Sequence, residues 1–218
     1  MKIAYPILLF MLLAVTSSSL AQNEGVNDVR ANLLFGLNQP LLGGFNIEGN
    51  LFYKRLVIDY SHGVGLNFDN NILDNENQAQ DLDIFIPWTT GFGIGYRFNP
   101  WLNLRAEPKW HKFELYYQDQ SPTQSNLIVD YTTFTLGLGL YANLRPFKKQ
   151  DNFLQGLMIA PSVRWWPQVT SSLPGNEFAY YNESTDQAEV HRAMEVGVSN
   201  SPWIINISLG YSFGFSKG

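Results

Sequence analysis

Hydrophobic and polar residues alternate along residues 81–117 with a period of two. From Leu82 to Phe98 the even positions are bulky apolar residues with one threonine, while the odd positions are largely glycine, threonine or charged. Because successive side chains of a β-strand point to opposite sides, this pattern predicts a strand. A turn at 99–101 and a second alternating run from Leu102 extend the prediction to a long β-hairpin. One of its faces is apolar, and the other carries glycine and charge.

Two features indicate that the apolar face points outward. Charged residues make up 15% of the chain, against about 25% in typical soluble domains. The bulky apolar side chains also exceed what the narrow lumen of a small barrel accommodates. We therefore predict a barrel whose outer face meets lipid. The alternative is a soluble ligand-binding barrel, in which the apolar face would lie inside.

Aromatic residues near both ends of the predicted hairpin are typical of the interfacial girdles of membrane barrels. Trp88 and Phe98 lie ten positions apart on the apolar face. At roughly 3.3 Å per residue and a tilt of about 40°, they span about 25 Å, the height of the apolar band of an outer-membrane barrel. The predicted girdle consists of Trp88, Tyr96, Phe98, Trp101, Trp110 and Trp165.

The same alternation continues along the chain and gives eight strands. The predicted strands cover 28–37, 44–53, 56–66, 81–98, 102–117, 127–145, 156–167 and 203–215. Most connections alternate between short turns and longer polar loops, as in outer-membrane barrels, where the short turns face the periplasm. We therefore predict an all-β fold, an eight-stranded antiparallel up-and-down transmembrane β-barrel. Its termini are expected to be periplasmic.

Residues 1–21 are predicted to be a signal peptide. Lys2 supplies the positive charge, residues 3–15 the apolar core, and Ser19-Leu20-Ala21 a small-residue cleavage site. The apolar run is shorter than the roughly 20 residues of a spanning helix, which disfavours an N-terminal anchor. We expect an exported chain with one barrel domain over 22–218. The sequence has no cysteine, which excludes disulfides and thiolate metal sites.

A family resemblance lies in residues 93–105, GIGYRFNPWLNLR, and in the Glu107-Pro108 pair that follows. These residues resemble the small eight-stranded outer-membrane barrels of OmpA/OmpX-type architecture, and most closely the PorT-like proteins. The resemblance implies the outer membrane of a Gram-negative-type cell, with outer-membrane lipid as a partner. Its PorT-like part implies a component of a secretion or surface-assembly apparatus.

The last strand resembles the signal that the barrel-assembly machinery reads. Its aromatic residues are Tyr211, Phe213 and Phe215. The usual pattern ends at the last aromatic residue, whereas three residues follow Phe215 here. The resemblance implies the assembly machinery as a partner.

Charged residues recur on the face that is predicted to point into the lumen. Because buried charges must be paired, and because the side chains of an eight-stranded barrel about fill its lumen, we predict a salt-bridged, closed interior. The alternative is a narrow ion pathway or a proton-sensitive gate. The predicted lumen charges are Arg30, Glu48, Asp59, Arg97, Arg105, Glu107, Lys109, Arg145 and Arg164.

No residue pattern predicts catalysis, metal binding or nucleic-acid binding. Outer-membrane lipid hydrolases carry a His-x-Ser pair, but none of His62, His111 and His191 has a serine two positions on. Scattered histidines give no metal-ligand spacing, and no basic cluster suggests nucleic acid. We predict a non-enzymatic protein without a cofactor. A lipid-modifying enzyme, with Glu107 and His111 as an acid–base pair, is the less favoured alternative.

The connection 168–202 is predicted to carry any binding function, because loops on a rigid scaffold often do. It contains three aromatic residues that we expect to be exposed, Phe178, Tyr180 and Tyr181. They are the candidate contacts for an extracellular ligand or for secretion-system proteins. The alternative is an ordered extracellular hairpin that shields the barrel rim.

Overall fold

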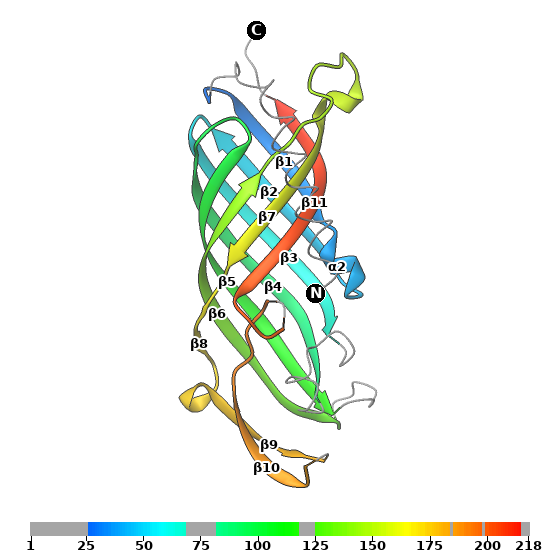
Figure 1. The fold of residues 1–218 in the computed structure, drawn as a ribbon, viewed down its shortest axis with the longest axis vertical. Coiled ribbons are helices and arrows are strands. Elements are labelled where there is room, and N and C mark those ends of the chain that lie inside the picture. The colour runs from blue at the N-terminus through cyan, green and yellow to red at the C-terminus, as the bar shows by residue number, and fades with distance from the viewer. Residues whose placement is uncertain (1–25, 69–81, 118–124, 184, 198, 215–218) are drawn as a thin grey trace.

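Eight strands of the chain form a closed antiparallel barrel in the computed structural model (Figure 1), which describes residues 26–68, 82–117, 125–183, 185–197 and 199–214. The barrel strands are β1 (Val29–Gly36), β2 (Phe45–Tyr53), β3 (Leu56–Phe68), β4 (Leu82–Arg97), β5 (Leu102–Tyr117), β6 (Leu127–Ala142), β7 (Leu157–Trp165) and β11 (Trp203–Gly214). Each pairs with its neighbours along the chain, and β11 closes the ring against β1. The predicted eight-stranded up-and-down barrel is confirmed.

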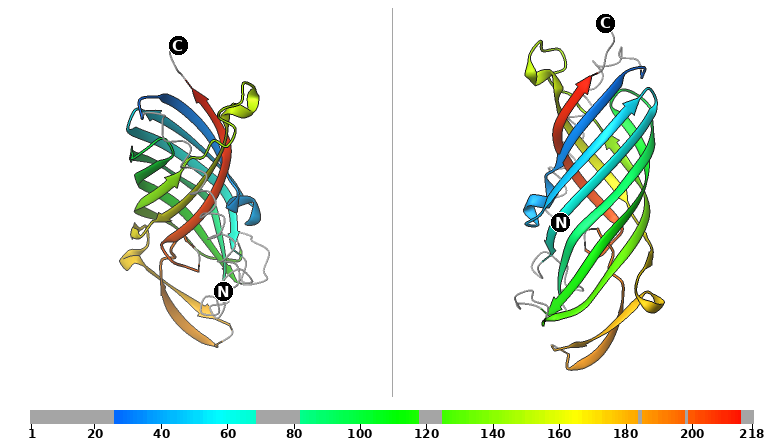
Figure 2. Two further views of the ribbon diagram at one scale, coloured as in Figure 1. Left: turned by 45° about the horizontal axis from the view of Figure 1, so that its top comes forward. Right: turned by 180° about the vertical axis from the view of Figure 1, so that it is seen from behind.

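The connections differ between the two ends of the barrel. At the end where β11 finishes, the connections are a tight turn at 54–55, the turn at 98–101, and 143–156 with the 3-10 helix η3 (Phe153–Gly156). At the other end lie the short helix α2 (Asn38–Leu41) and the long connection 166–202. Figure 2 shows both ends from two further sides. The predicted signal peptide and Phe215 lie outside the described residues.

The long connection 166–202 is an ordered structure of its own. After β7 the chain continues as β8 (Gln168–Ser171), which pairs with β6 beyond the point where β7 leaves it. A 3-10 helix, η4 (Pro174–Asn176), leads into a hairpin of β9 (Glu177–Asn182) and β10 (Gln187–Arg192). This hairpin lies at the end of the barrel opposite the short turns, as Figure 1 shows.

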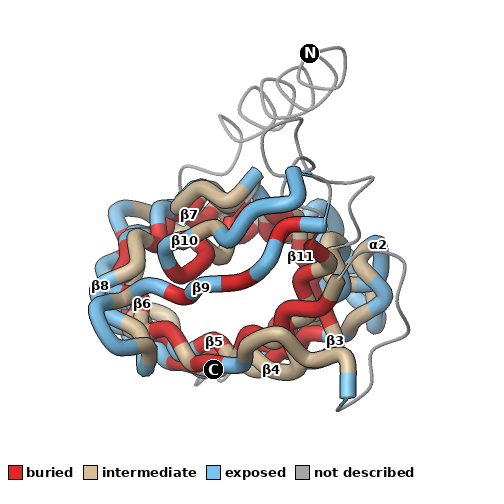
Figure 3. The backbone as a smooth tube through the Cα atoms, turned by 90° about the horizontal axis from the view of Figure 1, so that it is seen from below, coloured by how far each residue is buried: buried red, intermediate tan, exposed pale blue. Residues whose placement is uncertain are grey.

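Apolar side chains point outward over most of the barrel wall, and polar ones point inward. Strand β2 alternates at every position: Phe45, Ile47 and Leu51 are exposed, while Glu48 and Asn50 between them are buried. The view along the barrel in Figure 3 shows buried positions alternating with exposed ones along the strands. The predicted orientation of the two faces is confirmed for this part of the wall, and an apolar interior is contradicted there.

The prediction that all even positions of 82–98 share the outer face is wrong at the start of β4. Leu82, Ile84 and Ile86 are buried, whereas Phe92 and Ile94 are exposed. The physical reason is a β-bulge: the register against β5 shifts between Phe85 and Thr89. One extra residue on a strand exchanges its two faces.

Strand β3 exchanges its faces at the same level, at Gly65. Its φ of +70° lies in the left-handed region, which favours glycine. Strand β3 also runs two residues into the loop predicted at 67–80. Strand β6 ends at Ala142 rather than at Arg145, and beyond it Leu144 makes only an isolated bridge to Ile159.

Candidate functional site

Arg105 lies at the centre of a buried ionic cluster inside the barrel. Its Nη1 is 2.7 Å from Oε1 of Glu48 and 3.2 Å from Oδ2 of Asp59. Its Nε donates a hydrogen bond of 2.7 Å to Oδ1 of Asn103. The contacts join β5 to β2 and β3 across the lumen, so the strand alternation delivers each of these side chains to one place.

Glu107 organises the second half of the cluster. Its Oε1 accepts a 2.5 Å hydrogen bond from the Tyr141 hydroxyl, and its Oε2 accepts one of 2.9 Å from Nε1 of Trp166. Lys109 lies 3.8 Å from the same carboxylate and donates a 2.5 Å hydrogen bond to Oγ of Ser61. Both carboxylate oxygens therefore have donors, which buried charge requires.

Aromatic rings fill the space between the charges. The guanidinium carbons of Arg105 and Arg164 lie 3.8 and 4.9 Å from the centre of the Tyr141 ring. Lys109 lies 4.7 Å from the centre of the Trp166 ring. Arg164 also approaches Glu48 at 3.6 Å. These cation–π contacts add to the ion pairs.

We call this cluster the lumen network. Its members are Glu48, Asp59, Arg105, Glu107, Lys109, Tyr141, Arg164 and Trp166. Three carboxylates meet three cationic side chains, so the network is neutral when all are ionised. Arg105, Glu107 and Lys109 are at most 1% exposed, so water scarcely reaches them. The side chains therefore fill the lumen at this level.

A second buried pair of cations lies at the end with the short turns. Arg97 Nη1 is 2.9 Å from Oδ1 of Asp28, and Arg30 Nε is 2.5 Å from Oδ2 of the same carboxylate. The guanidinium carbon of Arg30 lies 5.2 Å from the centre of the Phe52 ring, and that of Arg97 lies 4.7 Å from it. This cluster occupies the barrel interior between the lumen network and the short turns. We call the short-turn end of the barrel, which is uppermost in Figure 1, its lower end.

Eight of the nine predicted lumen charges are buried inside the barrel, in these two clusters. The exception is Arg145, which is only partly buried because β6 ends before it and the connection 143–156 carries it. Tyr141 and Trp166 were not predicted as partners of these charges. Tyr141 was identifiable as an inward position beside the charges, whereas Trp166 has no signal apart from following the outward Trp165.

His111 has other partners than the acid–base pair considered from the sequence. Its Nδ1 lies 2.7 Å from Oγ1 of Thr89, and its Nε2 lies 3.0 Å from Oγ1 of Thr135. The side chain is fully buried. Glu107 is instead hydrogen-bonded to Tyr141 and Trp166. Among the described residues, no direct contact joins Glu107 to His111.

Beyond the points where β3 and β4 exchange their faces, the interior of the barrel becomes apolar. Strands β5 and β6 keep their inward parity, but their inward residues change from polar to Phe113, Leu115 and Tyr131. We call the buried apolar residues at this end the cap core. They are Leu66, Leu82, Ile84, Ile86, Phe113, Leu115, Tyr131, Phe178, Tyr180, Ala193 and Met194.

The hairpin of β9 and β10 closes the cap core from outside. Phe178 stacks on Tyr131 at 6.1 Å, and Tyr131 stacks on Phe113 at 5.3 Å. The Met194 amide donates a 2.9 Å hydrogen bond to the Tyr131 hydroxyl. Aromatic stacking and one backbone hydrogen bond thus attach the connection 166–202 to the barrel interior.

The expectation of exposed aromatic residues is wrong for two of the three. Phe178 and Tyr180 are 6% and 5% exposed, while Tyr181 is 48% exposed. Alternation along β9 explains the difference, because its even positions face the cap core. The segment is the ordered hairpin of the alternative interpretation, and a binding role for Tyr181 stays a prediction.

The outer surface around the cap core is polar. Lys112 and Asp130 form an ion pair there, and Glu114 accepts a 2.8 Å hydrogen bond from Tyr116. An apolar inside with a charged outside is typical of protein in water. The arrangement is therefore reversed with respect to the lower wall. The reversal occurs just beyond Trp110, whose ring lies 5.1 Å from that of Phe134.

The predicted girdle residues lie at two levels of the wall. Tyr96, Phe98, Trp110 and Trp165 are exposed, and Trp88 and Trp101 are partly exposed. Tyr96 and Phe98 contact edge to face at 5.6 Å near the short turns. The exposed Trp203 lies opposite Trp165 in the register of β7 and β11, and the sequence analysis missed it. Their role as membrane anchors stays a prediction.

A polar pocket of about 390 Å³ lies beside the hairpin. It is lined by Gln168, Asn176, His191, Arg192, Ala193, Met194, Glu195 and Asn200. Partial burial raises the pKa of the Glu195 carboxyl, and a hydrogen bond from the Gln168 amide opposes this shift. This pocket was not predicted from the sequence, because its residues meet only after β8 and β10 have folded back.

Replacing Phe178 with alanine is expected to loosen the hairpin without unfolding the barrel. Removing a buried phenylalanine costs about 3–5 kcal/mol, and the connection 166–202 bears that loss because Phe178 joins it to Tyr131. Limited proteolysis should cut the variant in this connection much faster than the wild type. Tyr181→Ala, which removes an exposed ring, should behave like the wild type. Equal cleavage of Phe178→Ala and the wild type would contradict the packing described.

Within the described residues, no helix is long and apolar enough to cross a membrane, and no group of three or more histidine or acidic residues could hold a metal ion.

No protein-family model matches the chain, and no curated protein sequence matches it. Two solved structures are similar. The N-terminal β-barrel domain of Pseudomonas aeruginosa OprF is 12% identical, with a TM-score of 0.36 over 87% of this chain and 100% of that one. A major outer membrane protein from Thermus thermophilus is 15% identical, with a TM-score of 0.41 over 86% and 98%. At these values the two structures assign no family, and the eight-stranded fold is established by the strand pairing of the chain itself.

Proposed function

We propose that this chain is a non-enzymatic outer-membrane β-barrel of a Gram-negative-type cell. Its lumen is closed, and the cap at the end opposite the short turns is its extracellular contact surface. The observation that carries the proposal is the reversal along the wall. On the short-turn side of Trp110 the outside is apolar and the inside carries the two ionic clusters, whereas on the cap side the outside carries charge and the inside is apolar.

A bilayer accounts for this reversal for two physical reasons. A closed barrel satisfies every strand hydrogen bond internally, which is the condition for β-structure in lipid. The exposed wall below Trp110 also carries more large apolar side chains than a surface in water tolerates, among them Leu136, Leu138 and Leu140 on one strand. The part of the barrel on the short-turn side of Trp110 therefore spans the membrane, and the cap stands in water.

The filled lumen favours a structural or binding role over a channel. Buried side chains fill the lumen at two successive levels, the neutral lumen network and the pair of Arg30 and Arg97 around Phe52. Loops on a rigid scaffold often carry binding sites. The polar pocket beside the hairpin and the exposed Tyr181 of β9 are candidate surfaces of this kind.

Cell fractionation and planar-bilayer recording test this proposal together. The chain should appear in the outer-membrane fraction, and the purified barrel should give no steady conductance. A soluble periplasmic chain would refute the location. Long-lived conductance steps of one size would refute the closed lumen while leaving the location intact.

The topology and assembly of the barrel belong to the same proposal. Residues 1–21 act as a signal peptide, 22–218 form the barrel domain, and the termini face the periplasm. Strand β11 carries Tyr211 and Phe213 with their rings 4.9 Å apart, which supports an outward aromatic signal for the barrel-assembly machinery. The secretion role implied by the PorT-like resemblance stays a prediction. If the chain has this role, co-purification from native membranes should recover partner proteins in stoichiometric amounts.

A further inference from the structure

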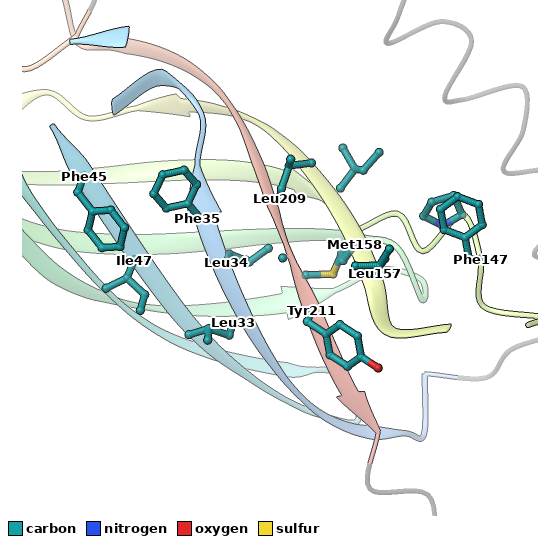
Figure 4. A pocket seen from close by; sticks show the side chains of 13 residues that line it. Leu33, Leu34, Phe35, Phe45, Ile47, Phe147, Leu157, Met158, Leu209 and Tyr211 are labelled. Atoms are coloured by element: carbon teal, nitrogen blue, oxygen red, sulfur yellow. The ribbon is translucent and has the colours of Figure 1, made fainter. Parts of the chain in front are cut away.

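A concave apolar groove of about 670 Å³ lies on the lower barrel wall, across β2, β1, β11 and β7. Its volume falls within the range of roughly 300–1,000 Å³ that is typical of small-molecule sites. Figure 4 shows the side chains that line it, and its outward members include Leu33, Phe35, Phe45, Ile47 and Leu209. Because these residues face outward below the reversal, the groove opens toward the lipid of the proposed membrane.

The floor of the groove is apolar on both sides of the wall. Gly210 on β11 lies opposite Leu34 of β1 and Met158 of β7 in the strand register. Leu34 and Met158 belong to a small buried apolar cluster inside the barrel, and all three residues line the groove. The wall is therefore thin at Gly210 and presents only hydrocarbon to an occupant.

The connection that lines one rim of the groove is rich in basic residues. Pro146 and Phe147 of the connection 143–156 line it, and the neighbouring residues are Arg145, Lys148 and Lys149. This concentration of positive charge stands out in a chain with a net charge of −5. The acidic residue of the same connection is Asp151, so the connection as a whole is cationic.

Tyr211 lies at the same rim and indicates that the rim is at the level of the lipid headgroups. Its ring packs directly on Gly156, where an added Cβ would come within 2.3 Å of the ring. Amphipathic tyrosine rings prefer the level of the lipid headgroups. The groove thus runs from hydrocarbon depth to a rim that combines Tyr211, Phe147 and basic residues.

We propose that this groove selectively binds an anionic phospholipid of the leaflet on the short-turn side. The acyl chain lies on β1 and β11, and the phosphate lies beside Lys148 and Lys149. Basic residues at a membrane surface attract anionic headgroups, while the apolar floor selects hydrocarbon. The inference rests on the proposed membrane location, but goes beyond it by assigning a lipid class and a site.

Native mass spectrometry of the barrel from bilayers of equal parts phosphatidylglycerol and phosphatidylcholine tests the headgroup. The wild type should retain phosphatidylglycerol preferentially. Lys148→Gln with Lys149→Gln should lower the ratio of retained anionic to zwitterionic lipid at least about fivefold. The matched control, Lys54→Gln with Arg55→Gln, removes two charges from another turn at the same end and should leave the ratio near that of the wild type. Equal effects of both pairs would overturn the assigned site.

Filling the groove tests the acyl-chain part. Leu209→Trp should reduce retention of both lipids, whereas Leu138→Trp on β6, at a similarly exposed outward position, should not. Unchanged lipid retention in Leu209→Trp would overturn the groove as the binding site. If the wild type instead appears as a dimer that Leu209→Trp abolishes, the groove binds a second copy of the chain, and the lipid inference is overturned. Before mass spectrometry, flotation shows whether the barrel is bound to vesicles of the same phosphatidylglycerol and phosphatidylcholine mixture. A barrel that floats but shows no lipid preference refutes this inference alone, whereas one that does not float refutes the proposed function.

Discussion

Replacing Arg105 with methionine is expected to lower the free energy of unfolding from a bilayer by about 3–5 kcal/mol, because removing one partner of a buried ion pair leaves charge uncompensated. Arg105 holds Glu48 and Asp59 at 2.7 and 3.2 Å, and all three side chains are buried. Without it, the carboxylates of Glu48 and Asp59, which stand on the neighbouring strands β2 and β3, lose the cation that both contact. Urea titration of the barrel in vesicles measures the loss.

Two controls separate the missing charge from the missing side chain. Adding Glu48→Gln and Asp59→Asn to Arg105→Met should recover much of the stability, because the buried charges are then removed together. Arg55→Met, at an exposed arginine of the 54–55 turn, should cost only about 0–1 kcal/mol. A loss in Arg105→Met no larger than that in Arg55→Met would contradict the lumen network.

Placing arginine at Leu138 is expected to cost about 2–4 kcal/mol, the value for a charge at the midplane of a bilayer on the lipid face of a barrel. Leu138 is exposed in the middle of β6, between Leu136 and Leu140 on the same face. A guanidinium there has neither water nor an anionic partner. The same urea titration in vesicles measures this cost.

Thr132→Arg is the matched control on the same strand and the same face. It lies beyond the reversal, beside the ion pair of Lys112 and Asp130, so we expect a cost of about 0–1 kcal/mol, as near a membrane interface. Equal costs at the two positions would mean that β6 does not cross from lipid into water between them.

The lower barrel was predictable from the sequence because its alternation is regular. Each residue's parity decides which side of a strand it occupies, and this alone placed Glu48, Asp59 and Arg105 inside. Parity could not show which of them meet. Arg105 is 57 residues from Glu48 and 46 from Asp59 in sequence, and their contact depends on the stagger of the strands around the barrel.

The cap was less predictable, for local reasons. A single extra residue between Phe85 and Thr89, and the left-handed Gly65, exchange the faces of two strands without changing the apolar alternation of the sequence. The apolar residues of the start of β4 therefore read as lipid-facing although they are core. Phe178 was misplaced similarly, because its burial depends on a hairpin folding back over the barrel end.

Labelling of single cysteines in a bilayer tests most directly that the lower wall faces lipid while the cap stands in water. The chain has no native cysteine, so Leu138→Cys, Thr132→Cys and Ser162→Cys report one position each. Ser162 serves as the inward site rather than Gly139, the inward neighbour of Leu138, because an added Cβ at Gly139 would come within 2.5 Å of Glu107 and Tyr141. A lipid-soluble thiol reagent should label Leu138→Cys, and a water-soluble one Thr132→Cys. Ser162→Cys should resist both until the barrel is unfolded. The contrary result is that only the water-soluble reagent labels Leu138→Cys while the lipid-soluble reagent labels Ser162→Cys. That result would indicate a soluble barrel with an apolar interior.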